Sequence, residues 1–322
     1  MSRYPVRPYD LRRIRTYPLK DRESKIEVDS FARPHAPGGS LVEFFGKMPG
    51  ILGAKNLRDL AGAVAGAFTA GKPVLWGLGG HVIKTGLSPV LIDLMDRGVV
   101  SGLALNGAAM IHDFEIALIG STSEDVEVQL RQGAFGMATE TGQGINEAVS
   151  LGAASGLGIG ESVGRYLSQK QPPFGECSIL LQAYLRNIPL TVHVTIGADI
   201  IHSHPSFSPS DTGEGTHRDF RLFASLVACL DGGGVYLNCG SAVNLPEVFL
   251  KCVALVRNSG ATLRDFTTAN LDFIQHYRPT ENVIRRPVSN GGRGIPITGH
   301  HEILIPLLAA WVIELLAGES AG

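Results

Sequence analysis

The sequence predicts an α/β protein whose mainly parallel sheet carries helices on both faces. Short apolar runs of strand length alternate along the chain with longer runs of helix length, a pattern typical of such sheets. Hydrophobic residues make up 44% of the 322 residues and charged residues 18%, which is enough for a large core. The same composition excludes a disordered chain.

The expected elements follow from apolar periodicity and from the Gly, Pro and Asn residues that interrupt it. Helices are expected at residues 59–70, 89–95, 108–118, 146–167, 220–229, 245–257 and 303–316. Strands are expected at residues 74–76, 99–105, 179–181, 190–194 and 234–237. The apolar run 303–316 is too short to cross a bilayer, so a buried helix is preferred for it.

Residues 1–58 differ from the rest of the chain. The first 25 residues carry eight Arg or Lys against three Asp or Glu, and a cluster of Pro and Gly follows at 34–39. We interpret residues 1–58 as a basic N-terminal arm and linker, and residues 59–322 as a single domain. The arm is expected to wrap a neighbouring subunit or to be a flexible tail, in preference to binding nucleic acid.

Charge and cysteine content narrow the class of protein further. The net charge of −2 gives no overall argument for binding nucleic acid or a membrane. The N-terminus lacks the apolar segment of a secretory signal, and the four cysteines form no Cys-x-x-Cys pair. A cytoplasmic protein is therefore expected.

Four small-residue segments are expected where strands lead into helices, which is where ligands bind in sheets of this kind. They are residues 77–81, 106–109, 231–235 and 267–270. Backbone N–H groups in such turns can contact a phosphate or a sugar; a tight turn without a ligand is the alternative for each. Because the first segment has only part of the G-x-G-x-x-G fingerprint, an ordinary Rossmann interpretation is rejected.

Histidine is concentrated near the same expected strand ends. His202 and His204, with a carboxylate, could hold a metal ion, but no recognised metal motif is present and we predict no metal site. The His-Asp pair at 112–113 and the His-His-Glu run at 300–302 are candidates for acid–base work or for binding ribose hydroxyls. Cys239 is a candidate nucleophile, although a buried, inert thiol is preferred.

Several stretches resemble, in order, the deoxyhypusine synthase family over residues 72–316. They are GHVIKTGL at 80–87, ALNGAAMIHD at 104–113, NIPLTVHVTIGADIIHSH at 187–204, DGGGV at 231–235, TTAN at 267–270, YRPTEN at 277–282 and HHEILIPLL at 300–308. The resemblance implies a single NAD-binding α/β domain and a homotetramer that binds NAD near its subunit interfaces. By position, it implies cofactor contacts at Gly80, His81, Val82, Asn106, Gly107, Ala108, Gly232, Gly233, Gly234, Thr268, Ala269, His300 and His301.

The family oxidises spermidine with NAD and passes an aminobutyl group, through a lysine imine, to a lysine of a translation factor. The resemblance implies that Asp199, His204 and Glu281 bind the substrate or move a proton. The imine-forming lysine has no counterpart, because the matching segment reads NVIRRP at 282–287. Arginine cannot replace it, since a guanidinium stays protonated and is a poor nucleophile.

The arginines near this segment indicate a different substrate. Arg278, Arg285 and Arg286 would repel a polyamine, whereas they suit a carboxylate or a phosphate. We therefore hypothesise that the substrate is not spermidine but an anion, with Arg285 as its charge anchor. Salt bridges between subunits are the alternative role for these arginines.

The sequence as a whole predicts a NAD-binding enzyme on the deoxyhypusine synthase scaffold that transfers hydride between NAD and a small metabolite. Its expected partners are that metabolite and other copies of the chain, as a tetramer, with neither nucleic acid nor membrane. Three alternatives stay open. They are an aminobutyl transferase that uses Lys251 or a free amine acceptor, a metal-dependent hydrolase that uses His202 and His204, and a non-catalytic NAD-binding oligomer.

Overall fold

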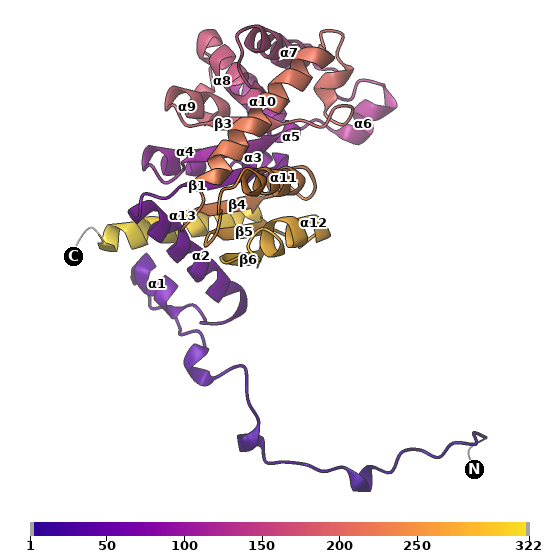
Figure 1. Cartoon of the computed structure of the whole chain (residues 1–322), viewed down its shortest axis with the longest axis vertical. Helices are drawn as coiled ribbons and strands as arrows, with labels where there is room; N and C mark the ends of the chain where they lie inside the picture. The colour runs from indigo at the N-terminus through magenta and orange to yellow at the C-terminus, as the bar shows by residue number, and fades with distance from the viewer. Residues whose placement is uncertain (1–2, 320–322) are drawn as a thin grey trace.

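The computed structural model describes residues 3–319 and arranges them around a six-stranded parallel sheet (Figure 1). The strands are β1 Val74–Leu78, β2 Gly102–Asn106, β3 Leu190–His193, β4 Val235–Cys239, β5 Thr267–Asp272 and β6 Arg293–Thr298. Their order across the sheet is β3-β2-β1-β4-β5-β6, and every neighbouring pair is parallel. The predicted α/β class with a parallel sheet is confirmed.

The helices connect the strands and precede or follow the sheet. They are α1 Leu41–Lys47, α2 Leu52–Thr69, α3 Gly80–Lys84, α4 Ser88–Asp96, α5 Gly107–Ile119, α6 Val126–Arg131, α7 Thr139–Ala154, α8 Ile159–Lys170, α9 Ile179–Leu185, α10 Pro209–Ala228, α11 Asn244–Asn258, α12 Tyr277–Pro279 and α13 His301–Glu319. Three short turns of helix also occur after β2: η4 Gly175–Cys177, η5 Ile200–Ser203 and the π-helical η6 Thr280–Arg285.

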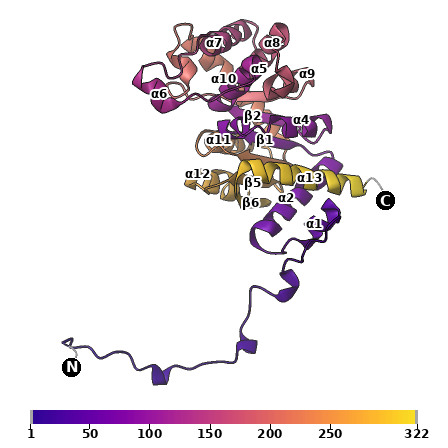
Figure 2. The same cartoon turned by 180° about the vertical axis from the view of Figure 1, so that it is seen from behind.

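Alternate side chains of each strand enter two hydrophobic clusters, one on each face of the sheet. Trp76 and Leu237 belong to the larger cluster, together with side chains of α2, α4, α5, α9 and α13. Leu75 and Tyr236 belong to the smaller cluster, together with side chains of α10, α11 and η6. Figures 1 and 2 show these two layers of helices from opposite sides. The predicted covering of both faces is therefore confirmed.

The strand order is that of a Rossmann-type, doubly wound sheet, in which the chain moves outward from β1 first in one direction and then in the other. The rejection of an ordinary Rossmann interpretation was wrong as far as topology is concerned. The glycine fingerprint describes only the turn after β1, whereas the strand order follows from crossovers that bury both faces of the sheet. An incomplete fingerprint therefore says little about the order of the strands.

Several predicted elements were wrong. Residues 179–181 begin helix α9 rather than a strand, because Ser178 and Asp113 accept the first N–H groups of that helix. The single helix expected at 146–167 is two helices, α7 and α8, separated by a Ser-Gly-Leu-Gly turn. The segment 267–270, expected as a turn, lies inside β5, and β6 was not expected at all.

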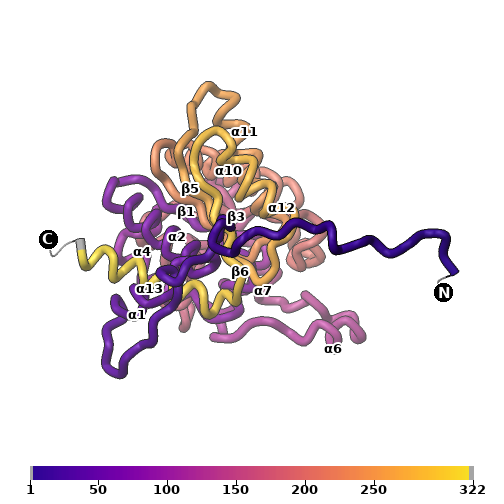
Figure 3. The backbone as a smooth tube through the Cα atoms, turned by 90° about the horizontal axis from the view of Figure 1, so that it is seen from below, coloured from indigo at the N-terminus to yellow at the C-terminus, as the bar shows by residue number. Residues whose placement is uncertain are grey.

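The N-terminal arm extends away from the sheet (Figures 1 and 3). Three short 3-10 turns, Leu11–Arg13, Leu19–Asp21 and Val28–Ser30, interrupt it, and its large apolar side chains are exposed. Packing against the domain begins at α1, where Phe45 stacks on Trp311 of α13 with ring centroids 4.3 Å apart. Helix α1 falls inside the segment assigned to the arm, yet it packs with the domain.

Helix α13 is the one helix within residues 3–319 that is long and apolar enough to cross a membrane, judged by length and composition alone. Its side chains Ile305, Leu308 and Val312 are buried in the larger hydrophobic cluster. The helix packs along α2 and also contacts α4. It therefore packs one face on the core. Residues 303–316 were expected to form a buried helix, but only 33% of residues His301–Gly318 are buried.

Candidate functional site at the carboxyl edge of the sheet

The carboxyl ends of the strands bring several candidate residues to one edge. β1 leads into α3 through Gly79, and β2 leads into α5 through Asn106, whose side chain accepts the N–H of Ala109 at 2.9 Å. A Cβ on Gly79 would lie 2.0 Å from the carbonyl oxygen of Gly240, just past β4. The N–H of Gly79 also donates to the carbonyl oxygen of Cys239 at 2.8 Å. This glycine is therefore explained by the close approach of the β1 and β4 ends.

Five of the predicted cofactor contacts do not lie at this edge. The glycine run precedes β4, so it lies at the opposite, amino edge of the sheet, beside Lys72. The Thr-Ala pair is buried in the middle of β5. The four predicted ligand segments therefore form no common cradle within one chain. The residues displaced in this way are Gly232, Gly233, Gly234, Thr268 and Ala269.

The other predicted contacts do gather at the carboxyl edge. They lie on α3 after β1, at the end of β2 and start of α5, or at the start of α13 after β6. Among them Val82 is fully buried in the larger hydrophobic cluster, so it packs α3 onto the core and is not available to a ligand. The residues of this group are Gly80, His81, Val82, Asn106, Gly107, Ala108, His300 and His301.

An aromatic cluster lies at the carboxyl ends of β1, β5 and β6. The ring of His81 lies 5.6 Å from that of Phe273 and 5.5 Å from that of His301, and His300 stacks on Phe273 at 6.1 Å. The side chain of His301 is buried, with Nε2 2.9 Å from the carbonyl oxygen of Leu271. Its Nδ1 is buried without a hydrogen-bond partner within residues 3–319. Burial lowers the pKa of His301, which favours the neutral ring.

Helix α3 also contributes to a cavity of about 770 Å³, because Lys84 lies in its wall. The cavity is bounded by α5, the loop that leads to α6, the start of α7 and the loop after β3. Apolar side chains such as Ile111, Phe135 and Ile200 line part of it. Its size is that of an ordinary small-molecule site. The charged and titratable residues in its wall are Lys84, His112, Glu115, Glu124, Glu140 and Asp199.

A chain of hydrogen bonds crosses the wall of this cavity. The Nδ1 atom of His112 lies 2.7 Å from Oγ1 of Thr122, and that hydroxyl donates to Oε2 of Glu115. Thr141 of α7 donates to the other carboxylate oxygen of Glu115 at 3.0 Å. Burial raises the pKa of Glu115, but the His112 ring 3.9 Å away and the hydrogen bonds from Thr122 and Thr141 outweigh burial and hold that pKa below its usual value. Glu115 is therefore a carboxylate near neutral pH.

Asp199, which was predicted as a catalytic residue, does line the cavity. It lies over the start of α5, where a Cβ on Gly107 would come 2.2 Å from its Oδ2 atom. Oδ2 accepts the N–H of Thr195 at 2.8 Å. Burial raises the pKa of Asp199, and the nearby His202 works in the opposite direction. The carboxylate occupies the helix end to which a phosphate would otherwise bind.

The other predicted catalytic residues do not line the cavity. His204 holds its Nδ1 2.7 Å from Oγ of Ser206 and packs against Gly142. Glu281 and Arg285 lie on η6, beyond β5, so four strand spacings of about 4.8 Å, roughly 19 Å in all, separate them from the β3 end of the sheet. Within one chain the predicted catalytic set is therefore divided between two places.

The arginines predicted to bind an anion have partners within the chain. Arg285 pairs with Glu281 at 2.6 Å, and Arg286 lies 3.6 Å from the same carboxylate. Arg278 lies 3.3 Å from Glu247 of α11. Three arginines therefore share two glutamates, and Glu247 also pairs with Lys251. Each arginine has a partner within the chain, so none is the free anchor that was expected for an anionic substrate.

The remaining candidates lie apart from the cavity or lack the required surroundings. Lys251 is exposed on α11 and pairs with Glu247 at 2.5 Å. Cys239 is buried in β4, and burial raises the pKa of its thiol, so the inert role expected for it fits. His202 Nδ1 accepts the N–H of Gly197 at 3.3 Å. Within residues 3–319, no group of three or more His, Cys, Asp or Glu side chains is placed to hold a metal ion.

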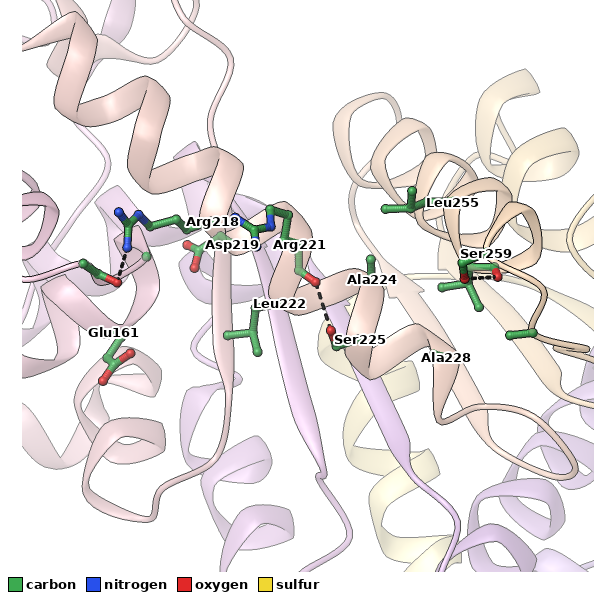
Figure 4. A pocket seen from close by; sticks show the side chains of 14 residues that line it. Glu161, Arg218, Asp219, Arg221, Leu222, Ala224, Ser225, Ala228, Leu255 and Ser259 are labelled. Atoms are coloured by element: carbon green, nitrogen blue, oxygen red, sulfur yellow. Dashed lines mark hydrogen bonds between the residues drawn. The ribbon is translucent and has the colours of Figure 1, made fainter.

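A second hollow of about 640 Å³ lies on the opposite face, between α8, α10 and α11 (Figure 4). Arg218 and Arg221 of α10 and Leu255 of α11 line it, and none of the predicted site residues do. Asp219 at its floor is buried and accepts the N–H groups of Val192 at 2.7 Å and Gly160 at 2.9 Å. Burial raises the pKa of Asp219 to about 7, and the carboxylate has a structural role in joining α8 to β3.

Most of the residues that line the cavity were not predicted from the sequence. The spacing of His112 and Glu115, three apart on one helix, places both side chains on one face and was readable as a pair. Thr122 comes from a loop and Thr141 from another helix, so no local pattern could join them to that pair. Lys84 lies in the GHVIKTGL stretch, four residues after Gly80, but nothing in the sequence indicated that it faces α5.

His193, the last residue of β3, makes stability at this end of the sheet depend on pH. Its ring is buried with Nε2 3.0 Å from Oγ1 of Thr191, and burial lowers its pKa to about 3. In the unfolded chain the pKa of His193 is near its ordinary value of 6.5, so below that pH the unfolded chain binds a proton at His193 and the folded chain does not. His193 therefore lowers the stability of the fold as pH falls from about 6.5 towards 3.

We expect the His193→Gln variant to lose this dependence. Relative to the variant, the wild type should lose up to about 1.4 kcal/mol per pH unit between pH 6.5 and 4.5. Urea unfolding at several pH values measures the difference, with His217→Gln on the exposed face of α10 as the control. A constant difference between wild type and His193→Gln over this range would contradict the burial of a neutral ring.

No family model and no curated protein matches the chain. A conserved protein described as LOR/SDH from Methanococcus maripaludis S2 shares 16% identity at a TM-score of 0.53, with 82% of this chain and 71% of that chain covered. AgrE, solved in a ternary complex with ornithine and NAD+, shares 15% identity at a TM-score of 0.54, with 81% and 33% covered. A protein described as a deoxyhypusine synthase from Entamoeba histolytica shares 10% identity at a TM-score of 0.49, with 87% and 95% covered.

The fold and the edge described above define the chain as a doubly wound α/β protein of the kind seen in the LOR/SDH protein and AgrE. Because the identities are this low, the similarity shows a shared fold alone, and the chain spans only about a third of AgrE. The TM-score of the deoxyhypusine synthase structure is too low to support an argument. The comparisons therefore show the fold of the chain, and the resemblance to the deoxyhypusine synthase family stays a prediction from the sequence.

Proposed function

We propose that the chain is a cytoplasmic, NAD-dependent enzyme that oxidises or transfers a group of a small, amine-bearing metabolite at the carboxyl edge of the sheet. The observation that carries the proposal is the position of α3. His81 of this helix belongs to the aromatic cluster, and Lys84 of the same helix lines the cavity. A cofactor ring at the cluster and a substrate in the cavity would therefore be neighbours.

The aromatic cluster suits a ring of NAD better than its pyrophosphate. His81 and Phe273 offer ring faces for stacking, and the unpartnered Nδ1 of His301 offers a hydrogen bond. NAD, when bound, supplies a hydride acceptor. The pyrophosphate is less well served, because the carboxylate of Asp199 lies at the start of α5. Groups for the pyrophosphate would then come from a second subunit.

The charge of the cavity favours an amine over an anion. Four carboxylates line it, from α5, the loop before α6, α7 and the loop after β3, against one lysine and one histidine. An ammonium group gains from nearby carboxylates, whereas an anion is repelled by them. This replaces the anionic substrate expected from the arginines, and it leaves Asp199 with the substrate-positioning role expected from the sequence.

We also propose that the chain forms a homotetramer in which the carboxyl edge of the sheet contacts another copy of the chain. Large apolar side chains that are 43–69% exposed follow β3, β4, β5 and β6 at the same edge. Monomeric proteins seldom expose such groups together. Light scattering of the full chain measures the oligomeric state, and a monomer at micromolar concentration would refute this part. The residues are Ile196, Val243, Phe273, Ile274, Tyr277 and Ile303.

The cofactor proposal predicts that NAD stabilises the folded protein. At about 100 times its Kd, a ligand adds about 2.7 kcal/mol, which for a chain of this size is a rise in Tm of several degrees. We expect this rise in the wild type, its loss in Phe273→Ala, and its retention in Leu255→Ala, which alters the second hollow instead. With NAD present, 1,4-diaminobutane should add further stabilisation and succinate should not.

Each outcome of this experiment separates one part of the proposal. No effect of NAD on the wild type, or an equal effect on Phe273→Ala, would refute the cofactor site. Stabilisation by succinate instead of the diamine would refute the charge assigned to the substrate. NAD binding with no turnover of any amine tested would favour the alternative of a non-catalytic NAD-binding oligomer.

A further inference from the structure

We propose that His112 is the proton-transferring base of this site, and that Thr122 and Glu115 hold its ring so that Nε2 faces the cavity unprotonated. The inference rests on the proposed function for the reaction that it serves, but its geometry stands without a cofactor. No motif of the sequence assigns a role to Thr122, and the three residues meet only in the folded chain.

The orientation of the chain of hydrogen bonds begins at Glu115. A carboxylate can only accept hydrogen bonds, and both of its oxygens are engaged here, Oε1 by Thr141 and Oε2 by Thr122. These two hydrogen bonds and the nearby His112 ring lower the pKa of Glu115 and keep it ionised at neutral pH. The single hydroxyl proton of Thr122 is therefore directed towards Glu115.

The orientation of Thr122 then determines the tautomer of His112. With its proton given to Glu115, the hydroxyl oxygen can only accept from the imidazole, so Nδ1 of His112 must carry a hydrogen. In the neutral ring the lone pair is then on Nε2. Glu115 lies 3.9 Å from the ring and also stabilises the cation that forms when Nε2 takes up a proton.

The surroundings place this nitrogen where a substrate would be. His112 lines the cavity, its side chain is 19% exposed, and no hydrogen bond within residues 3–319 occupies Nε2. The ring edge is packed closely, because a Cβ on Gly80 would lie 3.1 Å from Cδ2 of His112. The other charged groups facing the cavity are Lys84 of α3, Glu124 of the following loop, Glu140 of α7 and Asp199.

The chemical step is a proton transfer from an ammonium group. An N–H bond of the substrate breaks, its electron pair stays on the substrate nitrogen, and a new N–H bond forms at Nε2 of His112. The ring becomes an imidazolium that donates from Nδ1 to Thr122, while the substrate becomes a neutral amine. A free amine lone pair is what oxidation or transfer at the adjacent carbon requires.

The test reads the tautomer directly. Solid-state NMR of protein labelled with ¹⁵N-histidine, with His112→Gln to assign the signal, should show the Nδ1–H form of His112 in the wild type. Thr122→Val removes the hydroxyl with little change of volume and should shift the ring towards Nε2–H. Thr141→Val, the matched control, removes a hydrogen bond to the same carboxylate without touching the ring and should leave the tautomer unchanged.

Chemical modification provides the second readout. Diethyl pyrocarbonate acylates unprotonated imidazole nitrogen, and mass spectrometry follows the rate at His112 against the exposed His217. We expect Thr122→Val to slow modification of His112 roughly fivefold, the factor that corresponds to one ordinary hydrogen bond, and to leave His217 unchanged. An Nε2–H ring in the wild type, an unreactive His112, or a Thr122→Val variant that behaves as wild type would overturn the proposal.

Neither measurement uses NAD or a substrate, so this inference and the proposed function can fail separately. A protein that binds no NAD but has the Nδ1–H tautomer and a reactive Nε2 would keep the base and lose the cofactor. A protein stabilised by NAD with the opposite tautomer would keep the cofactor and lose the base.

Discussion

Replacement of Asp113 by Ala should cost about 4 kcal/mol of folding free energy, since it leaves three buried donors without partners. Oδ1 of Asp113 accepts the N–H of Ile179 at 2.7 Å, and Oδ2 accepts the hydroxyl of Ser178 at 2.6 Å and the N–H of Leu180 at 3.0 Å. The carboxylate is fully buried. It accepts hydrogen bonds from N–H groups at the start of α9 that water cannot reach.

Urea unfolding of Asp113→Ala measures this cost, and Asp93→Ala is the matched control. Asp93 is a half-exposed helix residue that pairs with Arg97 at 2.7 Å on the surface of α4, so its loss should change stability by about 0.5 kcal/mol or less. Burial raises the pKa of Asp113 to about 6, so the measurement is best made at pH 8, where the carboxylate is ionised. Equal effects of the two replacements would show that Asp113 does not anchor the start of α9.

Replacement of Gly79 by Ala should be nearly as damaging, for a steric reason. The new Cβ would lie 2.0 Å from the carbonyl oxygen and 2.5 Å from the carbonyl carbon of Gly240, and both atoms belong to backbone that cannot rotate away. We expect a loss of about 3 kcal/mol, because the β1 and β4 ends must separate. The same shift would move α3, so stabilisation by NAD should also disappear.

The control for this variant is Gly62→Ala. Gly62 lies on the exposed side of α2 with no atom within 4 Å of an added Cβ, and Ala favours a helix over Gly by about 1 kcal/mol. Thermal unfolding measures the stability of both variants, and the control should be slightly more stable than the wild type. A Gly79→Ala protein of wild-type stability would mean that β1 and β4 do not approach each other as closely as described.

Local patterns predicted the parts of the fold that depend on neighbouring residues. Buried strands such as Val74–Leu78 and helices such as α4 and α5 could be predicted from apolar runs, and the α/β class followed from their alternation. The same reasoning failed at residues 179–181, because a short apolar run is equally consistent with a strand or a buried helix. The contact that decides between them comes from Asp113, which is distant in sequence.

At the candidate site, too, some features could be predicted from the local sequence and others depended on the tertiary structure. The turns 77–81 and 106–109 were placed at the carboxyl edge from the sequence because each directly follows an apolar strand. The run 231–235 has the same composition but precedes its strand, so it lies at the other edge. Composition cannot distinguish these two cases, because a tight glycine turn serves either end of a strand.

By itself, the amino-acid order determined that this chain forms a parallel sheet with helices on both faces and that small residues follow its first two strands. Only the tertiary structure decided that Arg285 pairs with Glu281 instead of awaiting a ligand, and that His112, Thr122 and Glu115 meet in one cavity wall. The physical reason for this difference is the distance along the chain over which each interaction acts. Strand and helix preferences act over a few residues, whereas charge pairing and hydrogen-bond direction depend on side chains that only the folded chain brings within about 3 Å of each other.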